Sequence, residues 1–191
     1  MKITSAEFVR GVTNEENMVY DGLKQVAFIG RSNVGKSSVI NSITNNKKLA
    51  RSSSTAGRTQ EINLFLLNNK FYLVDLPGYG YARGSFEARE LITERIHWYL
   101  FDSNIDQYKV VLIIDGRTGM TDSDLEMYEA LKIHNKEIVI VVNKVDKLNL
   151  SEKQKCLNSV KAIAHDNLII PYSAEKHTNK DLLIDSIFPS K

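Results

Sequence analysis

Residues 30–38 read Gly30-Arg31-Ser32-Asn33-Val34-Gly35-Lys36-Ser37-Ser38 and match the pattern G-x-x-x-x-G-K-[ST]. An apolar run of strand length, 25–29, comes before them, and 39–43 can continue as a helix. Strand, glycine-rich turn and helix in this order are the setting in which the pattern binds phosphate. About one percent of chains of this length or fewer would contain the pattern by chance, so we interpret it as a phosphate-binding loop.

The residue types of this loop suit a triphosphate. Gly30 and Gly35 let the backbone approach the phosphates because no Cβ obstructs it. Backbone N–H groups along the whole stretch, together with the positive end of the following helix, form a site for anions. Lys36 would place its charge on the β- and γ-phosphates, and the Ser37 hydroxyl is a hard oxygen ligand for Mg²⁺.

The composition is that of a soluble globular protein. The chain has 191 residues, 42% of them hydrophobic and 25% charged, which is enough for one α/β domain with a sizeable core. No apolar run approaches the roughly 18 residues of a membrane span, and the first residues lack the apolar region of a signal peptide. The single Cys156 predicts a reduced thiol, so we expect a cytoplasmic protein with no membrane partner. A net charge of +2 is too small to demonstrate nucleic-acid binding.

Apolar runs alternate with helical patterns along most of the chain. The pattern predicts strands at 24–30, 61–67, 71–75, 109–115, 138–142 and 168–172 and helices at 36–45, 86–101, 122–134, 151–165 and 179–188. This alternation predicts a doubly wound, mostly parallel six-stranded sheet with helices on both faces. The short 68–70 link predicts a hairpin, and hence one antiparallel edge strand.

Polar residues at two helix starts predict caps, and the first residues of the chain form a separate segment. Thr121 or Asp122 would cap the helix at 122–134, and Ser151 would cap the helix at 151–165. Residues 1–22 are only weakly periodic, and we expect them to form an N-terminal arm, a short strand or an extended segment that packs on a domain of 23–191.

A second motif, Asp75-Leu76-Pro77-Gly78, ends one of the predicted strands. In a nucleotide-hydrolysing P-loop protein, this D-x-x-G arrangement lets the Asp75 carboxylate hold Mg²⁺ through a water and lets Gly78 offer its N–H to a γ-phosphate. Alone, Asp-x-Pro-Gly is equally typical of an ordinary turn. Its position behind the phosphate-binding loop favours the functional interpretation.

A third motif predicts which base is bound. Asn143-Lys144-Val145-Asp146 follows an apolar strand, and the Asp146 carboxylate can accept two hydrogen bonds, from N1–H and the exocyclic amine of guanine. Adenine cannot offer that pair of donors. Lys144 can lie along the base and Asn143 can tie this loop to the phosphate-binding loop. After the last strand, Ser173-Ala174 can bring a backbone N–H to guanine O6.

A polar, basic segment at 47–60 predicts a long functional loop. A threonine in it should place its hydroxyl on Mg²⁺ and its N–H on the γ-phosphate. Thr59, preceded by Gly57 and Arg58, is the preferred candidate because it is nearer the next strand, and Thr55 is the alternative.

With these elements in order, the chain resembles a Ras-like GTPase domain, and more closely the EngB (YihA/YsxC) family of bacterial GTPases, within the TrmE-Era-EngA-EngB-septin-like P-loop GTPases. The residues that carry the resemblance are 30–38, Thr55-Ala56-Gly57-Arg58-Thr59-Gln60 and Asp75-Leu76-Pro77-Gly78-Tyr79-Gly80-Tyr81-Ala82. One departure is Ala56, where the family usually has proline. The resemblance covers the chain from about residue 22.

The resemblance implies a GTP- and GDP-binding switch that acts in assembly of the large (50S) ribosomal subunit, with contacts to ribosomal RNA and proteins, and that cell growth and division require. We expect it to be monomeric. Basic residues near the predicted switch loops are the candidate ribosome contacts, and the alternative for each is an ordinary solvated surface charge: Lys47, Lys48, Arg51, Arg58 and Arg83. The alternative is a GTP-binding adaptor for a protein or membrane partner, with incidental hydrolysis.

Catalysis would rest on Lys36, Thr59 and Gly78, because the glutamine that positions water in Ras-type enzymes is replaced by Tyr79. An aromatic ring cannot orient a water through an amide, so the sequence predicts slow intrinsic hydrolysis. Some GTPases without that glutamine use K⁺ near the phosphate-binding loop, bound partly by an asparagine. Asn33 stands at the matching position and is the candidate K⁺ ligand; the alternative is that it only braces the loop.

Overall fold

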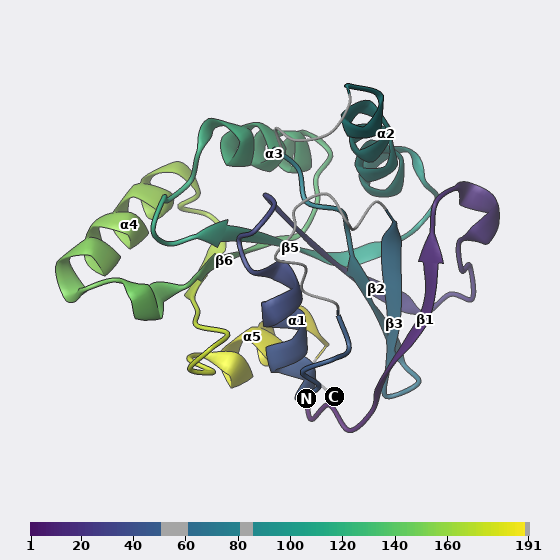
Figure 1. The fold of residues 1–191 in the computed structure, drawn as a ribbon, viewed down its shortest axis with the longest axis horizontal. Coiled ribbons are helices and arrows are strands. Elements are labelled where there is room, and N and C mark those ends of the chain that lie inside the picture. The colour runs from purple at the N-terminus through teal and green to yellow at the C-terminus, as the bar shows by residue number, and fades with distance from the viewer. Residues whose placement is uncertain (51–60, 81–85, 190–191) are drawn as a thin grey trace.

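The computed structural model describes residues 1–50, 61–80 and 86–189, which form a three-layer α/β domain (Figure 1). Its sheet has seven strands in the order β1-β3-β4-β2-β5-β6-β7. In chain order the strands are β1 (Ala6–Val12), β2 (Lys24–Gly30), β3 (Ile62–Leu67), β4 (Phe71–Asp75), β5 (Gln107–Asp115), β6 (Ile138–Asn143) and β7 (Leu168–Pro171).

Helices cover both faces of this sheet, as the alternating pattern predicts. Figure 1 shows α1 (Lys36–Thr44) and α5 (Lys180–Ile187) on one face, and α2 (Phe86–His97), α3 (Asp122–Ile133) and α4 (Leu150–Ile163) on the other. Short 3-10 turns occur at Glu15–Asn17 and Val145–Lys147.

Each face of the sheet has its own hydrophobic core. Strand β5 supplies both: Val110, Leu112 and Ile114 enter the core under α2, α3 and α4, whereas Val111 and Ile113 enter the core under α1 and α5. Successive side chains of a strand point to opposite faces, so a strand that is covered on both faces must be apolar throughout. This explains the continuous apolar run of β5.

The parallel strands bring several loops to one edge of the sheet. Strands β2, β4, β5, β6 and β7 are parallel to their neighbours within this group, so the loops that follow them all lie at their carboxyl ends. Strand β2 lies between β4 and β5, where the order of strands changes direction. Open α/β sheets bind ligands at such a switch point, and the loop at 30–35 follows β2 directly.

The predicted count of six strands is wrong, because residues 6–12 form a seventh. Strand β1 pairs antiparallel with β3 and so becomes the edge strand, with an irregularity between Phe8 and Arg10. Strand β3, the one described strand that runs against the others, therefore lies inside the sheet and not at its edge. The apolar pattern of β1 is weak because its outer face is solvated: Phe8 is 54% exposed, whereas Val12 is fully buried.

The predicted hairpin at 68–70 is confirmed. Asn68 and Asn69 have φ values of 52° and 53°, and Lys70 N–H donates to the Leu67 carbonyl oxygen at 2.9 Å. Positive φ at both central residues is the type I′ geometry that suits the twist of a two-stranded ribbon. The Asn68 side chain also accepts from the Thr4 and Ser5 N–H groups, so this turn holds the start of the chain beside the sheet.

Some predicted helix boundaries need correction. Helix α4 begins at Leu150, and its cap is Asn149 and not Ser151: Asn149 and Glu152 form a reciprocal capping box that satisfies two N–H groups. The predicted helix at 86–101 becomes α2 followed by a π-helical turn, Trp98–Asp102. The predicted cap at Thr121 is confirmed.

None of the described helices combines the length and the apolar character needed to cross a bilayer.

Candidate functional site

The loop after β2 has the backbone conformation of a phosphate cradle. Gly35 precedes α1 with φ of 94°, and Asn33 has φ of 68°. A side chain at Gly30 would collide with the Ile113 carbonyl oxygen, and one at Gly35 would lie 2.5 Å from Asn143 Nδ2. Only glycine therefore fits at either position, and the loop leads directly into the first turn of α1, whose N–H groups attract anions.

The cationic centre of the site is Lys36, which forms an ion pair with Asp75. The two side chains are 9% and 4% exposed, so each partner neutralises a charge that would otherwise be costly to bury. Asp75 ends β4 and Lys36 begins α1, so two separate motifs of the sequence meet here. Phosphate oxygens that enter the loop would compete with Asp75 for the Lys36 ammonium.

The residues around this ion pair fit Mg²⁺ bound together with phosphates. Ser37, half-buried in the first turn of α1, offers a hydroxyl oxygen, and Asp75 offers a carboxylate. Mg²⁺ in nucleotide sites typically takes one or two protein oxygens and completes its shell with phosphates and water. Within the described ranges no three metal-ligating side chains (His, Cys, Asp, Glu) come together.

Gly78 lies directly against the phosphate-binding loop. A Cβ built on Gly78 would lie 2.9 Å from Ser32 Oγ and 3.0 Å from Ser32 N and Cα. Tyr79, which follows Gly78, holds the two segments together, because the Ser32 N–H donates to its carbonyl oxygen at 3.0 Å. The D-x-x-G segment and the phosphate-binding loop thus form one continuous backbone surface.

The predicted tie between the third motif and the phosphate-binding loop is present. The Asn143 side chain, 2% exposed, donates from Nδ2 to the Val34 carbonyl oxygen at 2.9 Å. Its Oδ1 accepts from the Ala174 N–H at 3.3 Å. One buried amide therefore holds together three loops that follow β2, β6 and β7.

Asp146 presents a buried acceptor without a hydrogen bond. Its Oδ1 accepts from the Ser173 hydroxyl at 2.6 Å, whereas Oδ2 has no hydrogen-bond partner among the described residues; the Lys147 ammonium lies 3.3 Å from it, as an electrostatic contact. Burial acts to raise the pKa of Asp146, but Ser173 and Lys147 outweigh it and lower the pKa below its usual range. The group is therefore an ionised carboxylate with one oxygen available to a donor from a ligand.

Lys144 connects this loop to a residue that sequence reasoning did not assign, Asp115. The Lys144 ammonium donates to the Asn33 carbonyl oxygen at 2.6 Å and to Asp115 Oδ2 at 2.8 Å. Burial would raise the pKa of Asp115, but hydrogen bonds from Arg117 and Lys144 outweigh it and lower the pKa to about 2. The only local signal for Asp115 was its position at the carboxyl end of a buried strand.

Tyr79, at the position of the missing glutamine, is turned toward α3. Its hydroxyl donates to Asp124 Oδ1 at 2.8 Å, and its ring packs against the core. Burial and the negative charge of Asp124 raise the pKa of Tyr79, so the phenol stays protonated. Asp124 is a second residue that sequence reasoning did not assign.

Several predicted site residues lie outside the described residues: Arg51, Thr55, Gly57, Arg58, Thr59 and Arg83. Lys47 and Lys48 are described and exposed, but they follow the C-terminal end of α1. The phosphate-binding loop lies at the other end of that helix, about 13 Å away along its axis. Helix α1 thus separates these two lysines from the phosphate-binding loop, and their role as candidate ribosome contacts stays a prediction.

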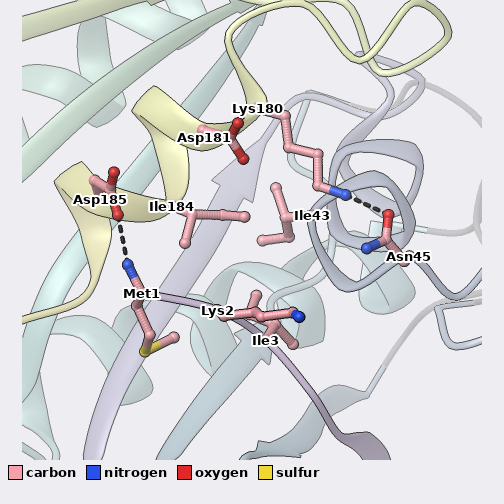
Figure 2. Close-up of a pocket in the computed structure, with 9 residues that line it drawn as sticks. All are labelled: Met1, Lys2, Ile3, Ile43, Asn45, Lys180, Asp181, Ile184 and Asp185. Carbon is pink, nitrogen blue, oxygen red and sulfur yellow. Dashed lines mark hydrogen bonds and ion pairs between the residues drawn. The ribbon is translucent and has the colours of Figure 1, made fainter.

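A pocket of about 540 Å³ also lies at that far end of α1 (Figure 2). Figure 2 shows its ion pair between the Met1 ammonium and Asp185, and a hydrogen bond from Lys180 to Asn45. It includes neither the phosphate-binding loop nor the Asp146 loop. Its lining residues are Met1, Lys2, Ile3, Ile43, Asn45, Lys180, Asp181, Ile184 and Asp185.

Comparison with known proteins agrees with this geometry. The family model described as "50S ribosome-binding GTPase" matches residues 25–144. A Clostridium perfringens protein named "Probable GTP-binding protein EngB" is 41% identical over 191 residues, covering 98% of this chain and 96% of that protein. The chain belongs to the EngB family of GTP-binding proteins.

Other EngB proteins give the same result. The Oceanobacillus iheyensis EngB protein is 39% identical over 184 residues, covering 95% of this chain and 94% of that protein. A crystal structure of a "probable GTP-binding protein engB" superposes with a TM-score of 0.71 at 30% identity, covering 86% of this chain and 96% of that one. The resemblance predicted from the motifs is confirmed, and with it a GTP-binding P-loop GTPase fold.

Proposed function

We propose that this EngB-family chain is a slow GTPase that acts as a monomeric, cytoplasmic switch in assembly of the large ribosomal subunit, and that cell growth and division depend on it. Membership of the family supports GTP binding and hydrolysis. The description of the matching family model, "50S ribosome-binding GTPase", supports the large subunit as partner.

The observation that carries the nucleotide assignment is Asp146 Oδ2, a buried oxygen that contacts the Lys147 ammonium but accepts no hydrogen bond from the described residues. A buried acceptor without a donor is costly, and a ligand that supplies an N–H removes that cost. Guanine offers N1–H and the exocyclic amine to the two oxygens of one carboxylate. The Ser173 hydroxyl would keep its bond to Oδ1, since a carboxylate oxygen has two acceptor directions. The Ala174 N–H would turn from Asn143 to guanine O6.

The phosphates would be bound by residues 30–38 and by Gly78. Lys36 would exchange its contact with Asp75 for the β- and γ-phosphates, which leaves the Asp75 carboxylate to face a metal-bound water. Mg²⁺, held by Ser37 and by Thr59 with Asp75 through water, would neutralise charge that develops on the phosphates. Gly78 would donate its N–H to the γ-phosphate.

Slow hydrolysis follows from the position of Tyr79. Its hydroxyl is engaged by Asp124, so no side chain at the glutamine position orients the attacking water. We propose that K⁺ at Asn33, or the bound ribosomal subunit, supplies the missing stabilisation. Lys144 already fixes the Asn33 backbone, which would hold the side chain at the rim of the loop.

Co-sedimentation with purified large subunits tests this function. The chain is mixed with large or small subunits and loaded with a non-hydrolysable GTP analogue, with GDP, or with no nucleotide. The proposal expects binding to large subunits that is several-fold stronger with the GTP analogue than with GDP. Equal recovery in all states, or no binding to either subunit, would contradict the ribosomal role and favour the alternative of a GTP-binding adaptor.

A further inference from the structure

Asp124 is a fully buried carboxylate that joins three parts of the molecule. It stands in the first turn of α3 and is 0% exposed. Oδ1 accepts from the Tyr79 hydroxyl at 2.8 Å, and Oδ2 accepts from Arg31 Nε at 3.0 Å. Oδ2 also accepts from the N–H and the hydroxyl of Thr121, at 3.0 and 2.8 Å. Donors from the phosphate-binding loop, from the D-x-x-G segment and from the helix cap therefore compensate the negative charge of Asp124.

The two residues that Asp124 binds are themselves neighbours in the backbone. Arg31 and Tyr79 form a parallel β-bridge, and Ser32 N–H donates to the Tyr79 carbonyl oxygen. The guanidinium of Arg31 has a second anchor, since its NH2 group donates to Thr118 Oγ1 at 2.9 Å. Asp124 therefore adds side-chain hydrogen bonds to a contact that the backbone makes through the Arg31–Tyr79 bridge, beside the weaker bond from the Ser32 hydroxyl to the Gly78 carbonyl oxygen at 3.4 Å.

This contact lies beside the point where a γ-phosphate would be bound. Gly78 is the residue before Tyr79, and its Cα approaches Ser32 so closely that a side chain would not fit. If the bridge loosened, Gly78 and its N–H would move away from the phosphate-binding loop. The N–H groups of residues 33–38, which would bind the β-phosphate, are anchored separately through Asn143 and Lys144.

We propose that Asp124 is a positioning residue for the γ-phosphate: by binding Tyr79 and Arg31 together, it holds the Gly78 N–H against the phosphate-binding loop. The proposal rests on GTP binding as given under the proposed function, and it distinguishes the two nucleotide states. Loss of the Asp124 hydrogen bonds to Tyr79 and Arg31 lowers the affinity for GTP more than the affinity for GDP, because only GTP has the phosphate that Gly78 would contact.

A helix cap alone would explain burial of Asp124 but not its other contacts. The capping box of α4 likewise places a carboxylate, that of Glu152, on the backbone N–H of the cap residue Asn149, and among the described residues the hydrogen bonds of Glu152 outside the helix ladder go to Asn149. Glu152 is therefore a matched control: its substitution removes a cap without touching a phosphate-binding segment.

The experiment compares Asp124→Asn, Tyr79→Phe and Glu152→Ala with the wild type. Affinities for GDP and for a non-hydrolysable GTP analogue are measured, with kcat, KM and urea unfolding. Asp124→Asn and Tyr79→Phe should each lower the ratio of GTP-analogue to GDP affinity by about fivefold or more and lower kcat. Tyr79→Phe loses one hydrogen bond to a charged acceptor, whereas Asp124→Asn replaces that charge by a neutral amide that has one oxygen fewer for its donors. Glu152→Ala should lower stability with an unchanged ratio. The double variant should lose little more than Asp124→Asn alone, since both substitutions weaken the same contact between Asp124 and Tyr79.

Tyr79→Phe decides the question if Asp124→Asn does not fold, because phenylalanine keeps the packing and loses only the hydroxyl. An unchanged affinity ratio in folded Tyr79→Phe and Asp124→Asn, with a wild type that binds GTP normally, would overturn this inference alone. A wild type that bound no guanine nucleotide would instead overturn the proposed function on which the inference rests.

Discussion

Replacement of Asp146 by asparagine should change the base that the chain prefers. The carboxylate is 9% exposed, and Oδ2 is an acceptor without a hydrogen bond until a ligand supplies one. In Asp146→Asn, one oxygen becomes an NH₂ donor that faces the donor amine of guanine, while it can donate to the O2 carbonyl of xanthine. Hydrogen bonds to a charged group contribute about 1.5–3 kcal/mol each and neutral ones about 0.5–1.5 kcal/mol, so replacing two charged bonds by one neutral bond costs about 2–5 kcal/mol. At 1.4 kcal/mol per factor of ten, the affinity for GDP should fall by about 30- to 4,000-fold.

Titration with fluorescent GDP and XDP measures both affinities directly. We expect XDP to bind the variant more tightly than GDP, the reverse of the wild-type order. Asp166→Asn is the matched control, because it makes the same chemical change at a carboxylate that is 86% exposed, and it should leave both affinities unchanged. GDP affinity within about threefold of wild type in Asp146→Asn would refute the assignment of this oxygen to guanine, since even one lost charged hydrogen bond exceeds that change.

Three further predictions concern nucleotide binding by Lys36, the effect of K⁺ on GTP turnover and the stability of the fold in acid. Lys36→Ala should weaken nucleotide binding by about 100-fold or more, as isothermal titration would show, because several charge-assisted contacts are lost at once; near-normal affinity would contradict this. GTP turnover should be faster in K⁺ than in Na⁺, and equal rates would remove the role proposed for Asn33. Asp115 has a pKa near 2 in the folded protein and an ordinary value when unfolded, so it stabilises the fold above about pH 4 by on the order of 2 kcal/mol and loses this effect as the pH falls toward 2. Urea unfolding of Asp115→Asn and wild type should therefore differ at pH 7 and converge in acid, and a difference that did not depend on pH would contradict this.

The parts of the site that the sequence predicts are those encoded by a few adjacent residues at strand ends. The backbone conformation of residues 30–38 can be predicted from these residues themselves, because glycine alone fits at positions 30 and 35. The parallel strands then bring Asp75, Asn143 and Asp146 to the same edge of the sheet, so their order along the chain was enough to predict that they meet. The Asn143 contact to Val34 is the clearest example.

The residues that were missed depend on partners far along the chain. Asp124 binds Arg31, 93 positions away, and Tyr79, 45 positions away, while locally it looks like an ordinary acidic residue in a first helical turn. Asp115 likewise acts on Lys144, 29 positions away. Strand β1 was underestimated for a different reason: an edge strand with one solvated face leaves only a weak apolar pattern.

The most direct measurement tests base recognition and binding to the large subunit in one experiment. Asp146→Asn is mixed with large subunits and loaded with a non-hydrolysable analogue of either GTP or XTP. If a guanine-nucleotide switch controls binding through Asp146, the variant should co-sediment with the XTP analogue and fail to do so with the GTP analogue, whereas the wild type should show the opposite. Co-sedimentation of the variant that is independent of the nucleotide supplied would contradict a nucleotide-controlled switch.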